Sequence, residues 1–82
     1  MRNEFFRNVV SQSKRNVFIK RLRKIGFKGP YSGSRHEFMI FQNHRLTIPS
    51  NKEYSVPQLK MMLKEAEDIL GREITMNQWN SY

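Results

Sequence analysis

The residues best suited to chemistry lie in one short segment, residues 31–39, which reads YSGSRHEFM. It contains His36, one of two histidines in the chain, and an imidazole can take up or release a proton near neutral pH. A strongly basic segment precedes it, and positive charge of this kind can hold a polyanion. The sequence therefore predicts that, if the chain is an enzyme, it acts on nucleic acid with His36 in proton transfer.

Other kinds of catalytic or cofactor site are not indicated. The second histidine, His44, falls in a predicted turn, where a solvated side chain is expected, and it forms no recognisable ligand set with His36. The chain has no His-Glu-x-x-His spacing, no glycine-rich phosphate loop and no cysteine. We therefore expect no metal, no small-molecule cofactor and no disulfide.

Positive charge is concentrated in the first half of the chain. The 82 residues carry 15 Lys and Arg against 7 Asp and Glu, a net charge of +8. Residues 1–45 hold eleven of the basic and two of the acidic side chains, whereas residues 46–82 hold four and five. This asymmetry favours RNA, DNA, an acidic protein or a membrane surface, with nucleic acid first because a basic face is its electrostatic footprint. An ordinary solvated surface is the alternative.

Length limits the chain to one domain with a small core, in which a deep cofactor cleft is not expected. The sequence shows no export signal and no run of about 20 apolar residues. We therefore expect a soluble cytoplasmic protein that is not bound to a membrane. Residues 1–12 are expected to form an N-terminal extension, either packed through Phe5, Phe6 and Val9 or free as an arm, and residues 13–82 a single domain.

Residues 14–25 have the apolar spacing of a helix. Phe18, Leu22 and Ile25 recur at intervals of four and three residues, and Gly26 is expected to end the helix. The exposed face would carry a density of cations able to make several phosphate contacts. These cations are Lys14, Arg15, Lys20, Arg21, Arg23 and Lys24.

Three short strands should follow this helix. The first spans residues 27–33, where Pro30 favours an edge strand because proline cannot donate a hydrogen bond to a neighbouring strand. The second spans residues 36–42 and the third residues 45–49, joined by a two-residue turn at Asn43 and His44. The pattern predicts a three-stranded antiparallel meander with a histidine at the entry to its middle strand.

A second helix, after a polar loop at residues 50–53, has the clearest helical pattern. Ser55 and Gln58 match an N-terminal capping box, Gly71 is expected to end the helix, and six apolar residues share one face: Leu59, Met62, Leu63, Ala66, Ile69 and Leu70. The capping pattern recurs at residues 75–78, which predicts a short final helix that carries three residues to the core: Ile74, Met76 and Trp79. The predicted class is α+β, with helices covering one face of the sheet.

The end of the first helix and the turn after it carry a family resemblance. Residues 18–27 read FIKRLRKIGF and residues 29–36 read GPYSGSRH. Residues 46–49 form a strand ending in Ile-Pro, and residues 59–66 begin a Leu-x-x-x-Leu helix. The HicA, or YcfA-like, toxin family pairs a helix ending in Leu-Gly-Phe with a Gly-Ser-His motif, a strand ending near Val-Pro and such a helix. The chain resembles this family over about residues 15–79.

The resemblance implies a fold like a double-stranded RNA-binding domain, with the order α-β-β-β-α, in residues 13–82. It also implies the toxin of a HicAB-type toxin–antitoxin system, a metal-independent endoribonuclease that cuts messenger RNA and is held inactive by a HicB-type antitoxin. The family's catalytic histidine falls on His36, and Arg35, or a lysine of the first helix, could offset charge on the phosphorane. RNA contacts are expected from Lys20, Arg21, Arg23, Lys24, Lys28 and Arg35.

Two features depart from the family pattern. Arg35 stands where typical members have serine, and the last long helix continues beyond Ala66, where the family usually ends in Ala-Gly. Two other functions are compatible with the same residues. One is a non-catalytic RNA-binding module of the same fold, in which His36 is a hydrogen-bonded residue at the edge of the core. The other is a protein that docks an acidic partner protein through its basic helix.

Overall fold

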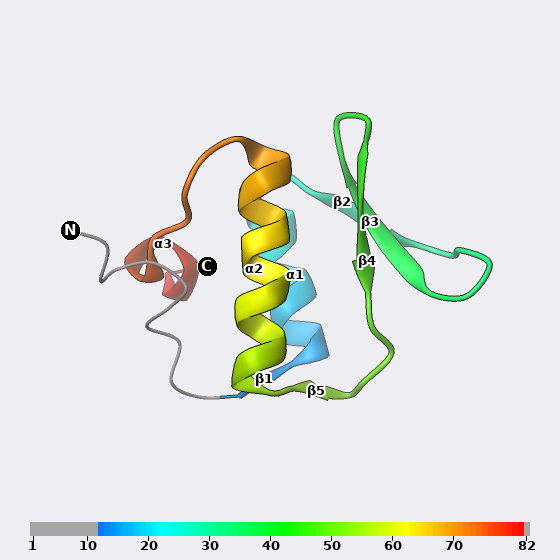
Figure 1. The fold of residues 1–82 in the computed structure, drawn as a ribbon, viewed down its shortest axis with the longest axis horizontal. Helices are drawn as coiled ribbons and strands as arrows, with labels where there is room; N and C mark the ends of the chain where they lie inside the picture. Colours follow the sequence, from blue (N-terminus) through cyan, green and yellow to red (C-terminus); the bar gives the residue numbers. More distant parts are fainter. Residues whose placement is uncertain (1–11, 82) are drawn as a thin grey trace.

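The computed structural model describes residues 12–81, which form three helices and five short strands (Figure 1). The elements in chain order are β1 (Ser13–Lys14), α1 (Arg15–Ile25), β2 (Lys28–Tyr31), β3 (Glu37–Phe41), β4 (His44–Ile48), β5 (Glu53–Tyr54), α2 (Val56–Leu70) and α3 (Met76–Asn80). Strands β2, β3 and β4 form an antiparallel sheet in that order, and β1 pairs with β5. The predicted α+β class with a three-stranded antiparallel sheet is confirmed.

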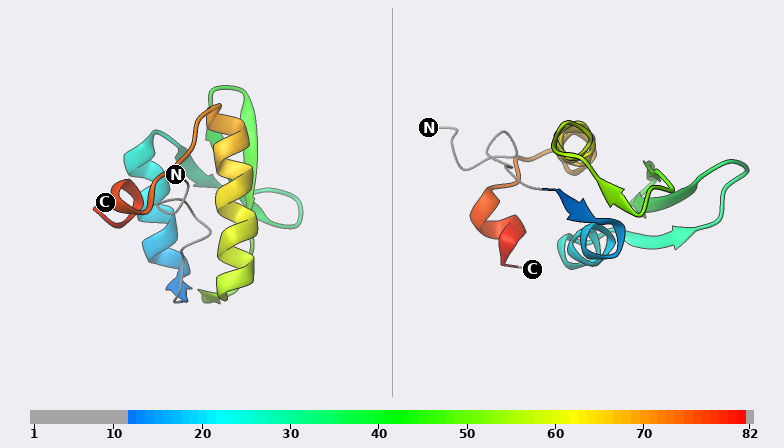
Figure 2. Two further views of the ribbon diagram at one scale, coloured as in Figure 1. Left: turned by 60° about the vertical axis from the view of Figure 1, so that its left-hand side comes forward. Right: turned by 90° about the horizontal axis from the view of Figure 1, so that it is seen from below.

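Strand β3 is the middle strand, as predicted, and its pairing with β4 decides which side chains face the helices. Met39 pairs with Leu46 and Glu37 with Ile48, and the three apolar members of these pairs are buried. Because successive residues of a strand point to opposite faces, the residues between them, beginning with Phe38, point away from the helices. We call this second side of the β2-β3-β4 sheet the open face. Seen from below in Figure 2, α1 and α2 lie together and the sheet extends away from them.

The hydrophobic core joins the sheet to all three helices. Phe18 of α1 meets the ring of Tyr54 edge-to-face, with centroids 5.5 Å apart, and lies 5.4 Å from the ring of Trp79 in α3. Ile74 is fully buried and Trp79 is 3% exposed. The prediction that a short final helix packs on the core is therefore confirmed.

The helices α2 and α3 begin at the residues that the capping pattern predicts. Ser55 Oγ accepts a hydrogen bond from the backbone N–H of Gln58 at 3.3 Å, and Thr75 Oγ1 accepts one from the N–H of Gln78 at 3.0 Å. These oxygens satisfy N–H groups that have no partner inside the helix. The reciprocal bond from the Ser55 N–H to the Gln58 side chain is not formed, and the Gln58 amide donates to Asn51 Oδ1.

The chain reversal between α1 and the sheet also follows the sequence. Gly26 ends α1 with φ 128°, a backbone conformation that residues with a Cβ rarely adopt. Pro30 lies in β2, which is an edge strand as predicted. The register of β2 against β3 shifts between Lys28 and Tyr31, and the Gly29–Pro30 peptide bond is cis.

The predicted secondary structure was wrong for both strands of the small β1-β5 sheet. Lys14, expected as the first helical residue, has an extended backbone and lies in β1 opposite Glu53, which was expected in a loop. Ser13 pairs with Tyr54 in the same way. Two residues per strand are too few to produce a periodic pattern, and their pairing depends on contacts between distant parts of the chain.

The strand boundaries in the β2-β3-β4 sheet also differ from the predicted boundaries. Strand β2 covers only part of the predicted residues 27–33, and β3 begins one residue after His36. The hairpin turn is Gln42-Asn43 rather than Asn43-His44, because Phe41 pairs with His44. Gln42 takes the positive φ of the turn, 56°. The register that buries the apolar residues of both strands decides the position of the turn, over the preference of Asn for this conformation.

Residues 1–11 and 82 lie outside the described structure, so the predicted packing of Phe5, Phe6 and Val9 falls there, together with nearly all of the expected N-terminal extension. Within residues 12–81, no helix has both the length and the apolar character needed to cross a membrane.

Candidate nucleic-acid site

His36 lies on the loop that connects β2 to β3, residues 32–36. This loop projects from the end of the sheet, away from α1 and α2 (Figure 1). Every residue of the loop is exposed, so the imidazole is accessible to a large substrate. The interpretation of His36 as a residue at the edge of the core receives no support, because Met39 and Ile48, rather than His36, occupy the sheet side of the core.

The loop turns tightly at Gly33. A Cβ at this position would overlap the backbone carbonyl oxygen of His36 and lie 3.3 Å from the ring of Phe38. Glycine is therefore needed because the backbone of the loop passes close to itself, and this close approach sets the position of His36 just before β3.

Gly33→Ala should consequently move His36 and lower any activity that depends on it by about tenfold to a hundredfold, because small displacements of a reacting group are costly. Ser32→Ala, in the same exposed loop, is the matched control and should have little effect. Activity and thermal unfolding are measured together for both variants. Unchanged activity in Gly33→Ala would show that the loop does not set the position of His36.

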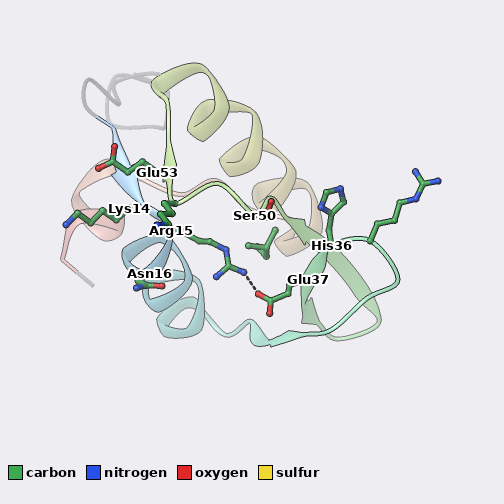
Figure 3. Close-up of a pocket in the computed structure, with 10 residues that line it drawn as sticks. Lys14, Arg15, Asn16, His36, Glu37, Ser50 and Glu53 are labelled. Atoms are coloured by element: carbon green, nitrogen blue, oxygen red, sulfur yellow. Dashed lines mark hydrogen bonds and ion pairs between the residues drawn. The ribbon is translucent and has the colours of Figure 1, made fainter.

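One side of the loop faces an open cleft of about 900 Å³, which we call the basic cleft. Its walls come from the start of α1, the start of β3 and the connection between β4 and β5 (Figure 3). The lining residues are Lys14, Arg15, Asn16, Arg35, His36, Glu37, Ile48, Ser50, Lys52 and Glu53. His36 and Glu37 point to opposite sides of the chain in Figure 3, which places His36 at the rim of the cleft.

An ion pair between Arg15 and Glu37 ties α1 to β3 inside this cleft (Figure 3). Arg15 Nε also donates to the backbone carbonyl of Pro49 at 3.3 Å, and the hydroxyl of Tyr54 donates to the same oxygen at 2.6 Å. One polar network thus holds together the first residue of α1, the first residue of β3 and the end of β4. Glu37 is engaged in this network and is not paired with His36.

The positive charge of the cleft exceeds its negative charge. Four cations, Lys14, Arg15, Arg35 and Lys52, line it with two carboxylates, Glu37 and Glu53. The N-terminus of α1 adds to this balance, because it has no side-chain cap and no acidic residue in its first turn, so the helix itself does not compensate the positive end of its dipole. The basic cleft therefore favours an anion such as a phosphate group.

Tyr54 gives this network a pH dependence. Burial raises the pKa of Tyr54 above its usual value of 10.0, the positive charge of Arg15 offsets part of the increase, and the negative charge of Glu37 adds to it. An acid with a raised pKa in the folded state holds its proton more tightly there than in the unfolded chain. The stability contributed by the neutral phenol is therefore fully present below about pH 10 and is lost as pH rises through the folded pKa.

The free energy of unfolding of the wild type should accordingly fall more steeply above about pH 10 than that of Tyr54→Phe, which cannot ionise. At pH 7 the variant should be less stable by about 1 kcal/mol, because it lacks the hydrogen bond to Pro49. Urea unfolding between pH 7 and pH 11 measures both effects. Tyr31→Phe, at a 45% exposed tyrosine, is the control and should follow the wild type. Parallel pH curves for Tyr54→Phe and the wild type would contradict the expected role of burial.

The predicted site residues are not gathered in one place. Arg35 and His36 lie together at the basic cleft. The exposed cations Lys20, Arg23 and Lys24 lie on the outer surface of α1 and do not line it. Arg23 donates to the carbonyl oxygen of Gly29 at 2.8 Å.

Arg21 and Lys28, which were also predicted to contact RNA, lie away from the basic cleft. The guanidinium of Arg21 lies 5.7 Å from the centroid of the Trp79 ring, and its Nε is buried without a hydrogen-bond partner. This half-buried arginine therefore packs against the C-terminal helix. Lys28 is exposed and pairs with Ile40 at the edge of the sheet.

The sequence reasoning did not single out the residues that complete the cleft. Lys14 and Arg15 were grouped with the rest of the basic helix, and Glu37 and Lys52 received no role. One local feature pointed to them, since two cations at the start of a helix oppose its dipole. Such a start needs compensation from elsewhere in the fold, which Glu37 supplies to Arg15.

His36 and Arg35 also line a second, shallow hollow of about 210 Å³, together with Gly33, Ser34, Phe38, Arg45 and Thr47. Phe38 and Thr47 form a pair on the open face. The loop therefore stands between two depressions, the basic cleft beside α1 and this shallow hollow on the open face. A chain-like ligand could contact His36 while occupying both.

No group of three or more His, Asp or Glu side chains that could hold a metal ion occurs in the described part of the chain. Comparison of the whole sequence and fold with protein-family models, curated proteins and solved structures gives no match.

Proposed function

We propose that the chain is a HicA-type endoribonuclease, the toxin of a HicAB-type toxin–antitoxin system, which cleaves messenger RNA without a metal and uses His36 for proton transfer. The observation that carries this proposal is the exposed imidazole of His36 at the rim of a basic cleft. The order of the helices and the three-stranded antiparallel sheet support a fold like a double-stranded RNA-binding domain. A HicB-type antitoxin would neutralise the toxin by covering the loop and the cleft.

The proposed reaction needs one proton acceptor and one proton donor. His36 removes the proton from a ribose 2′-hydroxyl, whose oxygen then forms a bond to the adjacent phosphorus. The bond from phosphorus to the 5′-oxygen breaks, and the imidazolium returns the proton to that leaving oxygen. The products are a 2′,3′-cyclic phosphate and a free 5′-hydroxyl, so atoms and charge balance. Arg35, adjacent to His36, would offset the charge on the phosphorane.

The products provide the test of this mechanism. Purified protein is incubated with a long RNA in the presence of a chelator, and the ends of the fragments are identified. We expect fragments ending in 2′,3′-cyclic phosphate and 5′-hydroxyl, and no cleavage where the ribose lacks its 2′-hydroxyl. Intact RNA, or cleavage that the chelator stops, would overturn the proposed metal-independent nuclease.

A non-catalytic RNA-binding module is the second candidate, and one observation favours it. Within residues 12–81, no side chain makes a hydrogen bond to His36, and the neighbouring carboxylate of Glu37 is paired with Arg15. An orienting partner, common for catalytic histidines, is thus not supplied by these residues. This candidate predicts intact RNA together with binding that weakens with salt, by roughly 0.7 log units per phosphate contact for each tenfold increase.

Expression in bacteria tests the toxin role separately from the chemistry. Production of the wild-type chain should arrest growth, and co-expression of a HicB-type antitoxin encoded beside it should restore growth. The His36→Ala variant should not arrest growth. Unimpaired growth with well-expressed wild-type protein would contradict the toxin assignment.

A further inference from the structure

The open face of the sheet has an unusual composition for a surface. The register places six side chains on it, two from each strand: Lys28, Tyr31, Phe38, Ile40, Arg45 and Thr47. Two are aromatic, two are cationic and none is acidic. Tyr31 is 45% exposed, one of three large apolar side chains on the surface of the described residues. The helices cover only the opposite face, so four of the six side chains are exposed, whereas Phe38 and Ile40 are half-buried.

The two aromatic rings are in contact, and an arginine lies over one of them. The rings of Tyr31 and Phe38 lie 5.8 Å apart at an interplanar angle of 40°, and the guanidinium of Arg45 lies 4.3 Å from the centroid of Phe38. Cross-strand contacts of this kind stabilise a sheet, but that role does not require the large exposure of Tyr31. An exposed aromatic ring next to a planar guanidinium is the arrangement on which unpaired bases stack in single-stranded RNA.

Positive and negative side chains lie at opposite borders of the open face. Lys28 on β2 is exposed at the edge beside Tyr31, and Arg35 and His36 stand at the end near Phe38. On the other side, beyond β4, the surface next to Arg45 and Thr47 is lined by the carboxylates of Glu65 and Asp68 of α2, which repel phosphate.

A base stacked at Tyr31 and Phe38 would lie next to the loop that carries His36. The shallow hollow lined by Phe38 is also lined by His36 and Arg35, and the same two residues line the basic cleft. A strand whose base occupies the open face can therefore place its next phosphate at His36 and continue toward the cations of the cleft. A base-paired duplex cannot do this, because its bases are stacked on each other.

We propose that the open face of the sheet binds single-stranded RNA by stacking one unpaired base on Tyr31 and Phe38, and that this places the adjacent phosphate at His36. The stacking site itself does not depend on catalysis, although its placement of the phosphate rests on the proposed endonuclease function. The substrate class is thereby narrowed to unpaired RNA.

The test measures the binding of short 2′-O-methyl RNA oligonucleotides, which this chemistry cannot cleave because the 2′-oxygen is blocked. Tyr31→Ala should weaken binding of the single strand by roughly 5- to 150-fold, the loss expected when stacking of one base is removed. Tyr31→Phe keeps the ring and should bind like the wild type. Met61→Ala, at an exposed apolar residue of α2, is the matched control and should have no effect.

Two further measurements separate stacking from attraction by charge. Tyr31→Ala should lower affinity at every salt concentration without changing the slope of log affinity against log salt concentration. Lys28→Gln should reduce the magnitude of this slope by about 0.7, the contribution of one phosphate contact. An oligonucleotide with abasic positions keeps its phosphates but should bind the wild type as weakly as the normal oligonucleotide binds Tyr31→Ala. If Tyr31→Ala fails to fold, Phe38→Leu, which keeps the apolar bulk but removes the ring, gives the same comparison.

The outcomes distinguish this inference from the proposed function. Cleavage of RNA by the wild type, with equal oligonucleotide binding by Tyr31→Ala and the wild type, would overturn the stacking site and leave the nuclease in place. Weakened binding by Tyr31→Ala, with no cleavage by the wild type, would support the stacking site and overturn the nuclease. If the wild type bound duplex RNA and single-stranded RNA with equal affinity, the stacking site would also be overturned. If Tyr31→Ala bound RNA like the wild type but no longer bound a protein partner, the open face would be assigned to that partner.

Discussion

His36→Ala should lower the rate of RNA cleavage by about 10² to 10⁴, the usual contribution of a positioned general acid or base. The side chain is exposed and makes no hydrogen bond to another side chain of residues 12–81, so its removal should leave stability within about 0.5 kcal/mol. Initial rates on one RNA, with thermal unfolding of the same samples, measure both quantities. The combination of a large loss of rate and unchanged stability would exclude a purely structural role for His36.

His44→Ala is the matched control for this experiment. His44 is also an exposed histidine, but it begins β4, pairs with Phe41 at the hairpin and does not line the basic cleft. It should cleave RNA like the wild type. If His36→Ala retained wild-type cleavage, the assignment to His36 would be wrong, and the nuclease would need another proton-transfer group.

Phe18→Ala should lower the free energy of unfolding by about 3–5 kcal/mol, because a fully buried aromatic ring would be replaced by a cavity. A domain of this size has only about 4–12 kcal/mol in total, so much of the population should unfold near body temperature. Phe18 contacts both Tyr54 and Trp79, so the loss should release α3 first. Urea unfolding followed by circular dichroism, together with the fluorescence of Trp79, measures stability and the docking of α3.

Val17→Ala provides the control in the same turn of α1. Val17 is 37% exposed, and shortening it should change stability by less than about 1 kcal/mol. Phe18→Leu, which fills part of the cavity, should fall between the two. A loss below about 1 kcal/mol in Phe18→Ala would show that α3 and β5 do not depend on this ring for their packing.

In the family proposed for this chain, typical members have serine at the position of Arg35, and the surroundings of Arg35 indicate what the arginine contributes. The side chain borders both the basic cleft and the shallow hollow. A serine there would be neutral and would bring no positive charge to a phosphate at His36. Arg35 therefore supplies the proposed site with a cation that stands on the loop itself rather than on α1.

Helices and their ends could be predicted from the sequence because they depend on residues close in the chain. The apolar face of α2, the caps at Ser55 and Thr75, and the glycine that ends α1 all rest on interactions within a few residues. The order of the three main strands and the edge position of Pro30 also followed from local patterns. The exposed histidine next to a basic segment was visible for the same reason.

The remaining features depend on pairs of residues that are far apart in the chain. The β1-β5 sheet joins Lys14 to Glu53, and the basic cleft depends on the contact between Arg15 and Glu37. Neither pair is encoded by a periodic pattern, since both depend on how α1 packs against the sheet. The sequence placed the RNA contacts along α1, whereas the structure places the start of that helix, rather than its outer surface, beside His36.

By itself, the sequence determined the α+β class, the helices with their caps, the basic character of the first half and the candidate histidine. Only the tertiary structure decided which face of the sheet the helices cover, and hence that Tyr31, Phe38 and Arg45 lie together on the open face. It also decided that His36 stands between this open face and the basic cleft. The physical reason is that alternation along a strand separates two faces, but burial against the helices selects which of them is left to bind a ligand.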